Sequence, residues 1–483
     1  MNKLNKCIDE LVDYGVKHLG LAPKNVDYVR NGILEKLGVA FPAEKASCGE
    51  KKAPELLSEF VAEAVKSGLF DEADAEKYCD FIMGELSLLP QDLEELFLQT
   101  EKASGSKKAT EMLYNYCVAN DYVKKAKLDK NPRFDVNGLT VTINKAKPEF
   151  RDAKKAAAGN SVGGGYPLCS ICHQNEGFCG RAKRTLRTVE LTLGGQKWFW
   201  QYSPYGYFYQ HGIAVNYEHI PMHVDFGTFG RLMDFVDRFP HYFIGCNAAL
   251  PRIGGSVLAH DHYQGGGESL PLHKAGAKHT LTDGKTGATV EVLDWPGTVV
   301  RVVSADRKAI ESVSERIRAA WVAYDNAALG IIHEDKDGIH NAISPTVVKT
   351  ARGYEMSIIL RSNITSAQYP DGVFHAHPEF HIIKKESIGL IEAQGLFILP
   401  GRLEKELGDI AELIVAGQPL TAELKDFEFV YNEIVALTDG KRDKKSVDNA
   451  IKSELGSVCY RILQNTAVFK DDKMTLEFVK GVL

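Results

Sequence analysis

The sequence predicts an α+β protein in which two antiparallel β-sheet halves with flanking helices follow a helical N-terminal region. Three observations support this fold class. Apolar residues repeat with helical spacing over the first ~125 residues, and from Tyr166 onward β-branched and aromatic residues alternate with polar ones. The expected strands lie too close together along the chain for helical crossovers, so an antiparallel sheet fits better than a doubly wound parallel one.

The length and composition predict a globular protein of two or three domains. The chain has 483 residues, of which 44% are hydrophobic and 25% charged, and domains usually have about 100 to 200 residues. We expect a helical region at residues 1–151, a first sheet half at 166–285, and a second sheet half with C-terminal helices at 286–483. The glycine-rich stretch from Asp152 to Gly165 has the composition of a linker.

The charge balance and the N-terminal residues exclude several classes of protein. With 58 basic and 64 acidic residues the net charge is −6, which disfavours nonspecific binding to nucleic acid. Asp9, Glu10 and Asp13 interrupt any secretory apolar segment, and no run of 18 apolar residues could span a membrane. We therefore expect a cytoplasmic protein that binds neither nucleic acid nor membranes and keeps its nine cysteines as reduced thiols.

The helical prediction rests on two apolar stripes with spacings of three and four residues. Their members are Leu4, Cys7, Ile8, Leu11 and Val12 near the start, and later Leu93, Leu96 and Phe97. The expected breaks are at Pro23, Pro42 and Pro90.

The predicted strands begin with a hairpin, in which Gly194 and Gly195 separate Val189–Leu193 from Lys197–Trp200. Further strands are expected at Tyr207–Val215, Val290–Leu293, Val299–Val303, Val347–Thr350 and Glu355–Leu360. Apolar stripes predict two helices between them, spanning Phe229–Phe239 and Lys308–Ala328. Each half also contains a His-x-His element, so the two halves weakly echo each other.

The densest group of histidines lies between two glycine pairs. Of the 15 histidines, 14 follow residue 172, and residues 254–266 read Gly-Gly-Ser-Val-Leu-Ala-His-Asp-His-Tyr-Gln-Gly-Gly. If Ser256–Gln264 is a strand, its period of two places His260, His262 and Gln264 on one face. The glycines allow the close backbone approach that phosphate-binding loops need. Two structural histidines are the alternative, but the glutamine and the glycines favour a functional site.

Cys169 and Cys172 form a Cys-x-x-Cys pair, for which zinc is the stronger interpretation. No thioredoxin-like pattern of strand and helix surrounds the pair, so a redox role has less support. Zinc requires four ligands, of which two must come from elsewhere in the fold. The candidates are His173, Cys179, His219, His223 and His260. Two cysteines packed in a core are the alternative.

Two basic segments suit an anionic ligand. Arg181 and Arg184 stand in a run of four cations within seven residues, and guanidinium groups can bind phosphate oxygens bidentately. A solvated basic strand face is the alternative.

Lys384 and Lys385 could neutralise a diphosphate. Upstream of these lysines, an expected strand would place four side chains on one face, able to bind a second metal or a substrate: His375, His377, Glu379 and His381.

Together these segments resemble the class II galactose-1-phosphate uridylyltransferases, relatives of the histidine-triad proteins. The resemblance covers essentially the whole chain. It rests on residues 254–266, on Cys-x-x-Cys-x-x-Asn-Glu-Gly-Phe (169–178), on Phe-Pro-His-Tyr-Phe-Ile-Gly-Cys-Asn (239–247), and on Ile-Ile-Lys-Lys-Glu-Ser-Ile-Gly-Leu-Ile-Glu (382–392). It implies histidine-triad-like sheet halves, a homodimer, and exchange of UMP between UDP-glucose and galactose 1-phosphate in galactose metabolism.

Carried over by position, His262 resembles the family's nucleophile and Gln264 the glutamine that hydrogen-bonds the transferred phosphoryl group. A neutral imidazole suits this role, because the negative oxygens around phosphorus repel an anionic nucleophile. The reaction would be a double displacement through a uridylyl-histidine intermediate. Asp261 and Tyr263 stand where the class I form has proline and a small residue, which makes class II the closer relative.

The resemblance also implies metal ligands and substrate contacts. The ligands of a structural zinc would be Cys169, Cys172, His219 and His260. Asn247 and Ser256 resemble ribose or phosphate contacts, and a second metal would lie near His375 and His377. Two other functions remain as alternatives: a histidine-triad nucleotide hydrolase or dinucleotide phosphorylase, and a non-catalytic zinc-bearing binding module.

Overall fold

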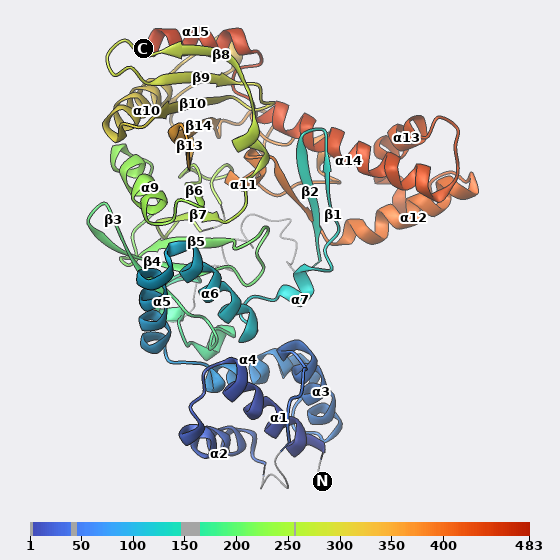
Figure 1. Ribbon diagram of the computed structural model, residues 1–483. Coiled ribbons are helices and arrows are strands. Elements are labelled where there is room, and N and C mark those ends of the chain that lie inside the picture. The colour runs from blue at the N-terminus through green and yellow to red at the C-terminus, as the bar shows by residue number, and fades with distance from the viewer. Residues whose placement is uncertain (1–2, 40–45, 146–164, 256) are drawn as a thin grey trace.

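The computed structural model describes residues 3–39, 46–145, 165–255 and 257–483 (Figure 1). Its first part is helical, as predicted, with α1 (Lys3–His18), α2 (Val26–Leu37), α3 (Ala53–Lys66), α4 (Ala75–Leu86), α5 (Pro90–Ser104), α6 (Ser106–Ala119) and α7 (Lys125–Leu128). The stripe from Leu4 to Val12 lies in the apolar core shared by α1 to α4. Pro90 begins α5, where no N–H is needed. Pro42 and, apart from Gly165, the predicted linker lie outside the described residues.

Helices α5 and α6 pack against the sheet rather than into the core of α1 to α4. Leu93 and Phe97 of α5 and Leu113 of α6 belong to the same buried cluster as the strands. The ring of Phe97 meets that of Phe239 edge-on, with centroids 6.4 Å apart. The N-terminal helices therefore form two packing units, and the second one supports the sheet.

One continuous sheet of ten strands is the centre of the molecule, and its order is β3-β4-β5-β7-β6-β13-β14-β10-β9-β8. Every pairing within it is antiparallel, which confirms the predicted α+β class. The strands are β3 (Val189–Leu193), β4 (Gln196–Tyr202), β5 (Gly212–Asn216), β6 (Phe243–Gly245), β7 (His262–Gly266), β8 (Ala277–Thr282), β9 (Thr289–Leu293), β10 (Val299–Ser304), β13 (Asn341–Thr350) and β14 (Gly353–Ser362).

The two halves of the sheet repeat the same order of elements: three strands, a helix and two strands. The helices, α9 (Phe226–Arg238) and α10 (Arg307–Val322), lie side by side on one face, where Arg307 bonds the carbonyl of Gly230 at 2.7 Å (Figure 1). At the centre β6 pairs with β13 and joins the halves. The predicted echo is thus confirmed in the order of elements.

The His-x-His elements do not correspond in the two halves, contrary to the expectation. His260 and His262 lead into β7, whereas His375 and His377 follow β14. The expected strand at residues 375–381 is wrong, because Pro378 begins a short 3-10 turn there, Pro378–Phe380.

Two other predicted strands start too early, and one helix ends early. Tyr207–His211 forms a turn before β5, and the residues from 257 to 261 form a loop before β7. In that loop the N–H of Asp261 bonds the carbonyl of Ile220 at 2.7 Å. Helix α10 ends at Val322 instead of Ala328, because a separate 3-10 turn, Ala327–Leu329, follows.

A second, smaller unit lies beside the sheet and is drawn on the right of Figure 1. It contains β1 (Arg133–Val136), β2 (Leu139–Asn144), β15 (Leu396–Pro400), α12 (Arg402–Ala416), α13 (Glu428–Leu437) and α14 (Lys444–Thr466), which share a core. β2 pairs in parallel with β15, so residues within 1–151 and within 286–483 build one unit. The last helix, α15 (Asp472–Val482), returns to α10 and β9.

The shorter elements of the described fold include β11 (Glu334–Asp335), β12 (Gly338–Ile339), α11 (Leu390–Ala393) and the 3-10 turn Pro271–Lys274. The predicted boundary between the two sheet halves, between residues 285 and 286, remains a prediction. Strand β8 precedes this boundary in the sequence but pairs with β9, which follows it.

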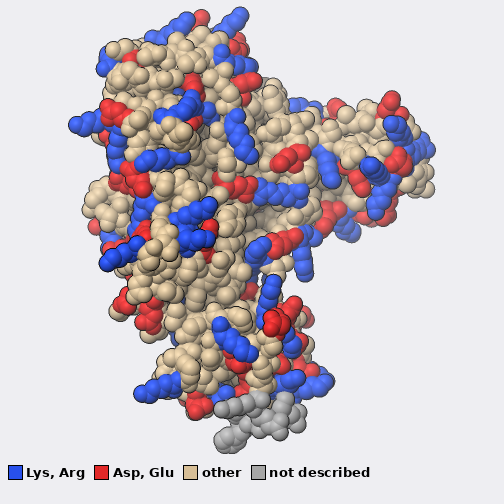
Figure 2. All heavy atoms as spheres, in the orientation of Figure 1, with Lys and Arg blue, Asp and Glu red and all other residues tan. Residues whose placement is uncertain are grey.

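On the face drawn in Figure 2, Lys and Arg are interspersed with Asp and Glu and form no large area of one sign. Among the described residues, no helix is long and apolar enough to cross a membrane.

The fold predicts one costly substitution in β7. A Cβ added to Gly265 would lie 2.1 Å from the carbonyl oxygen of Phe243 on β6, so Gly265→Ala should lower the free energy of unfolding by about 1–3 kcal/mol. Gly276→Ala is the matched control, because a Cβ there has no neighbour within 4 Å among the described residues. Thermal melting should show a lower Tm for the first variant only; equal Tm values would contradict the packing.

Candidate functional site

Four metal-ligating side chains from three segments meet in one buried cluster. Sγ of Cys169 lies 3.4 Å from Sγ of Cys172 and 3.3 Å from Nδ1 of His260, and Sγ of Cys172 lies 3.1 Å from Nδ1 of His219. All four ligand atoms lie within 4.8 Å of one another. The edges of a tetrahedral zinc site with these ligands are about 3.4–3.8 Å, so the set fits a metal such as zinc.

Hydrogen bonds hold the cluster in this arrangement. The side-chain amide of Asn175 donates to the carbonyls of Cys169 and Cys172, both at 2.8 Å, and so shapes the turn between the cysteines. Nε2 of His260 lies 2.8 Å from the carbonyl of Asn216. Because a carbonyl can only accept, Nε2 carries the proton and Nδ1 offers its lone pair to the cluster, as second-shell bonding commonly arranges for a metal-bound histidine.

The cluster shifts the pKa values of its two thiols in opposite directions. The hydrogen bond from Cys172, assisted by His260, lowers the pKa of the Cys169 thiol to about 3. The same hydrogen bond, with burial, raises the pKa of Cys172. One thiolate is thus favoured before any metal arrives, which suits a site that binds a cation.

The other zinc candidates named from the sequence stay outside this cluster. Cys179 is exposed. His173 lies 3.4 Å from Glu176, and His223 points to the carbonyl of Pro221 and to Arg231. The four residues that the family resemblance implied are the ones that come together.

His262 is buried at the start of β7, immediately beyond the cluster. Its Nδ1 lies 2.8 Å from the carbonyl of His260, so Nδ1 carries the proton and Nε2 keeps a lone pair. Burial lowers the pKa of His262 from its ordinary value and therefore favours the neutral imidazole. A neutral ring with an unprotonated Nε2 is the state that a nucleophile requires.

Gln264 shares the sheet face of His262, and His211 orients it. In β7 the side chains of residues two apart point the same way, which confirms that part of the strand prediction; His260 instead lies in the loop. Nδ1 of His211 accepts the Tyr207 N–H at 3.3 Å, so its Nε2 donates to Oε1 of Gln264 at 3.4 Å. The amide NH2 of Gln264 is then the end that can donate to a ligand. Sequence reasoning missed His211, since the segment before β5 was expected to be a strand.

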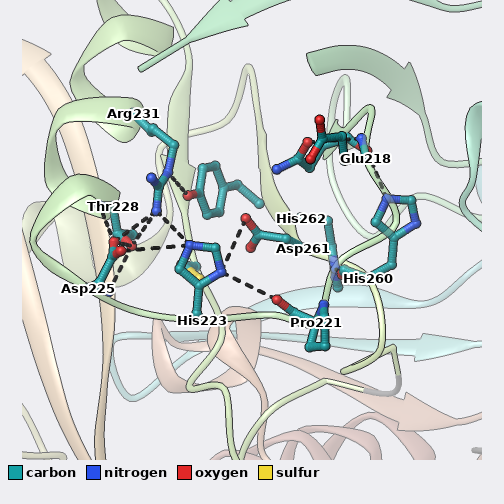
Figure 3. Close-up of polar contacts among 12 residues, drawn as sticks. Glu218, Pro221, His223, Asp225, Thr228, Arg231, His260, Asp261 and His262 are labelled. Carbon is teal, nitrogen blue, oxygen red and sulfur yellow. Dashed lines mark hydrogen bonds and ion pairs between the residues drawn. The ribbon is translucent and has the colours of Figure 1, made fainter. Parts of the chain in front are cut away.

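The opposite face of β7 is anchored to α9 (Figure 3). Tyr263 stacks on Trp198 with ring centroids 4.7 Å apart, and its hydroxyl accepts from Nε of Arg231 at 2.7 Å. Asp261 is completely buried 3.7 Å from Nδ1 of His223, and burial raises its pKa. Figure 3 shows Arg231, His223 and Asp261 of this network beside His260.

Asn247 follows β6 and reaches the second half of the chain. Its Oδ1 accepts the Leu390 N–H at 2.8 Å, while its buried Nδ2 has no hydrogen-bond partner among the described residues. A Cβ on Gly255 would lie 2.9 Å from this Nδ2. Ser256, the other expected contact, lies outside the described residues.

The four cations expected to bind phosphate differ in their burial and in their ion pairs. Arg184 pairs with Glu85 of α4, and Lys384 is buried between Glu392 at 3.0 Å and Glu386 at 3.2 Å. Arg181 is half-buried and Lys385 exposed. Arg184 and Lys384 are thus engaged by carboxylates of the fold, and phosphate binding by the four residues stays a prediction: Arg181, Arg184, Lys384 and Lys385.

The expected second metal finds no ligand set in the described part of the chain. His375 and His377 join no group of three ligand-type side chains there. His377 stacks on Tyr369 with centroids 4.0 Å apart, and its Nε2 bonds the carbonyl of Val373. Burial, with Arg361 nearby, lowers the pKa of His375 to about 4. A guanidinium beside this imidazole opposes a divalent cation.

Comparisons with known proteins point to one family. Two family models match, described as "Galactose-1-phosphate uridyl transferase, N-terminal domain" at residues 53–221 and "Galactose-1-phosphate uridyl transferase, C-terminal domain" at residues 235–426. The solved structure of yeast Ap4A phosphorylase Apa2 is similar at a TM-score of only 0.34, with 12% identity over 70% of this chain and 97% of that chain.

Curated relatives match over nearly their whole length. The galactose-1-phosphate uridylyltransferase of Bifidobacterium longum is 55% identical over 98% of this chain and 97% of its own. That of Bacillus subtilis is 35% identical over 96% and 94%, and that of Halalkalibacterium halodurans is 33% identical over 96% and 95%. The chain belongs to the galactose-1-phosphate uridylyltransferase family.

Proposed function

We propose that the protein transfers UMP from UDP-glucose to galactose 1-phosphate, giving glucose 1-phosphate and UDP-galactose, as an enzyme of galactose metabolism. Membership of the uridylyltransferase family supports the activity and the substrates. The observation that carries the mechanism is the buried imidazole of His262, whose Nδ1–H is held by the His260 carbonyl at 2.8 Å.

The reaction is a double displacement on the α-phosphorus. Nε2 of His262 attacks this phosphorus, the bond to the oxygen that bridges the two phosphates breaks, and glucose 1-phosphate leaves. UMP stays on Nε2 as a phosphoramidate. A phosphate oxygen of galactose 1-phosphate then attacks the same phosphorus and the N–P bond breaks. The His260 carbonyl accepts from Nδ1–H throughout and stabilises the positive charge that the ring carries in the intermediate.

Gln264 stabilises the transferred phosphoryl group, and His211 acts through it as a positioning residue. The amide NH2 of Gln264 donates to a non-bridging oxygen, where a comparable donor contributes about 2–4 kcal/mol. Because His211 holds Oε1 at 3.4 Å, the amide cannot present its oxygen to the phosphate. A neutral donor also leaves His262 outside any ion pair.

Cys169, Cys172, His219 and His260 would hold a structural zinc. With four protein ligands the ion has no open position for substrate, so the chemistry it supplies is cross-linking of three segments. Since His260 is both a ligand and the carbonyl partner of His262, the cluster fixes the reactive ring.

Substrate contacts, assembly and location complete the proposal. Asn247 and Ser256 would contact ribose or phosphate, and the basic side chains would add positive charge around the diphosphate: Arg181, Arg184, Lys384 and Lys385. A second metal near His375 and His377 has no support in the described ligand groups. We expect a cytoplasmic homodimer that acts on small-molecule substrates.

The metal assignment predicts about one zinc per chain in protein purified without chelator. Cys172→Ser should lower both the zinc content and the Tm, since the ligand set loses one of its two thiolates. Cys179→Ser, at an exposed cysteine outside the cluster, is the control and should change neither. Elemental analysis checks this, and a full zinc complement in Cys172→Ser would refute the assignment.

The nucleophile can be tested by chemical rescue. His262→Gly should fold and bind UMP but lose exchange by about 10³-fold or more, and added imidazole should restore slow release of uridylyl-imidazole from UDP-glucose. His241→Gly, which removes an imidazole bonded to Thr110 at 2.8 Å, should keep the exchange. With UDP-glucose labelled in the α-phosphate, wild-type label should sit on His262; label on another residue would overturn the mechanism.

The positioning role of His211 predicts non-additive losses. Gln264→Ala should slow formation of the labelled enzyme by about 10²-fold, and His211→Ala by about 10-fold, without loss of zinc. Because His211 acts through Gln264, the double variant should be no slower than Gln264→Ala alone. Multiplied losses in rapid-quench labelling would show that the two residues act independently.

A further inference from the structure

Arg361 of β14 is a buried cation that pairs with no carboxylate among the described residues. Its side chain is 1% exposed. Nη2 donates to the carbonyl of Ile388 at 2.7 Å, while Nε and Nη1 have no hydrogen-bond partner among the described residues. Burial lowers the pKa of Arg361 to about 10. A buried charge with two unmade hydrogen bonds is costly unless something else supplies the acceptors.

Glu392 is the carboxylate that interacts electrostatically with Arg361, but it cannot supply those acceptors. Its Oε1 lies 3.0 Å from Nζ of Lys384, and its Oε2 accepts the Gly389 N–H at 3.2 Å. Within the described chain no ion pair of Arg361 is formed. The contrast on the same sheet face is Arg301 of β10, whose side chain donates to Ser357, Leu272, Ala275 and Glu291.

A second donor, Nδ2 of Asn247, also has no hydrogen-bond partner among the described residues. Asn247 and Arg361 contact the same short segment of the chain. Asn247 bonds the N–H of Leu390 and Arg361 the carbonyl of Ile388. These anchors are two residues apart, at most about 7 Å along the chain. Each side chain therefore uses one polar atom to hold the Ile388–Leu390 segment. Its remaining N–H groups are available to donate to a bound ligand.

The strand register places these donors on the face of the reactive histidine. Gln264 pairs with Gly245, Gly245 with Thr346, and Thr346 with Ser357. Paired residues, and residues an even number apart on a strand, share a face. Arg361 therefore faces the same side as His262 and lies three strands away, about 14 Å between the strands. Asn247, two residues beyond Gly245, lies between them.

From this arrangement we propose that Arg361 binds the phosphate of the hexose 1-phosphate, in the position taken by the β-phosphate of the UDP-sugar, with Asn247 donating to the same group. The inference rests on the proposed function, because only then does a sugar phosphate leave and enter beside His262. The guanidinium fork supplies two N–H groups to anionic oxygens, which completes its hydrogen bonds. It also supplies the positive charge where a second metal was expected.

The test is binding of two probes, glucose 1-phosphate and UMP, to full-length protein by titration calorimetry. Arg361→Met should weaken glucose 1-phosphate about 10- to 100-fold and UMP by no more than about twofold. It should also keep or raise the Tm, because it removes a buried charge that has no carboxylate partner among the described residues. Arg301→Met is the matched control: it breaks satisfied bonds and should lower the Tm. Arg361→Lys, which keeps the charge but not the fork, should weaken glucose 1-phosphate by a smaller factor.

Two results would overturn the inference. One is an unchanged Kd for glucose 1-phosphate in both Arg361 variants. The other is a lower Tm with equal weakening of both probes, which would make Arg361 a structural cation. Failure of the proposed function looks different, since wild-type protein would then take no α-phosphate label from UDP-glucose. If label forms normally while Arg361→Met binds glucose 1-phosphate like wild type, only the present inference fails.

Discussion

The carbonyl oxygen of His260 connects the two parts of the site. The imidazole of the same residue belongs to the metal-ligating cluster, with Nδ1 3.3 Å from Sγ of Cys169, while its carbonyl holds Nδ1 of His262 at 2.8 Å. Any movement of the cluster would therefore turn the reactive ring. The tautomer of His262, its unprotonated Nε2 and its alignment with Gln264 all follow from one short stretch of backbone that the cluster keeps in place.

The sheet supports this stretch from behind. Tyr263 points away from the site to Trp198 and Arg231 of the helix-covered face, so alternation along β7 separates packing from chemistry. Gly265 lets β6 approach closely. Aromatic packing thus fixes one face of the strand, and hydrogen bonds orient the polar side chains on the other face. Those polar side chains are the ones available to a substrate.

Although both halves of the sheet repeat the same order of elements, they differ in what they carry on the site face. The first half has His262 and Gln264. On the same face of the second half, Arg301 bonds Ser357 and lies 3.5 Å from Glu291, so these polar groups satisfy one another. The first half carries the proposed nucleophile, His262, whereas Arg361 and the segment near Leu390 belong to the second half. In the proposed mechanism, one reactive centre is built from two similar halves.

The sequence by itself determined the α+β class, the helical start and most strands, and it located the Cys-x-x-Cys and His-x-His-x-Gln segments, because periodicity and motif spacing are local properties. Only the tertiary structure decided that His211 orients Gln264, that β2 pairs with β15, and that Arg361 is buried without a carboxylate partner among the described residues. These features depend on contacts between residues far apart in the chain, for which the sequence contains no periodic signal.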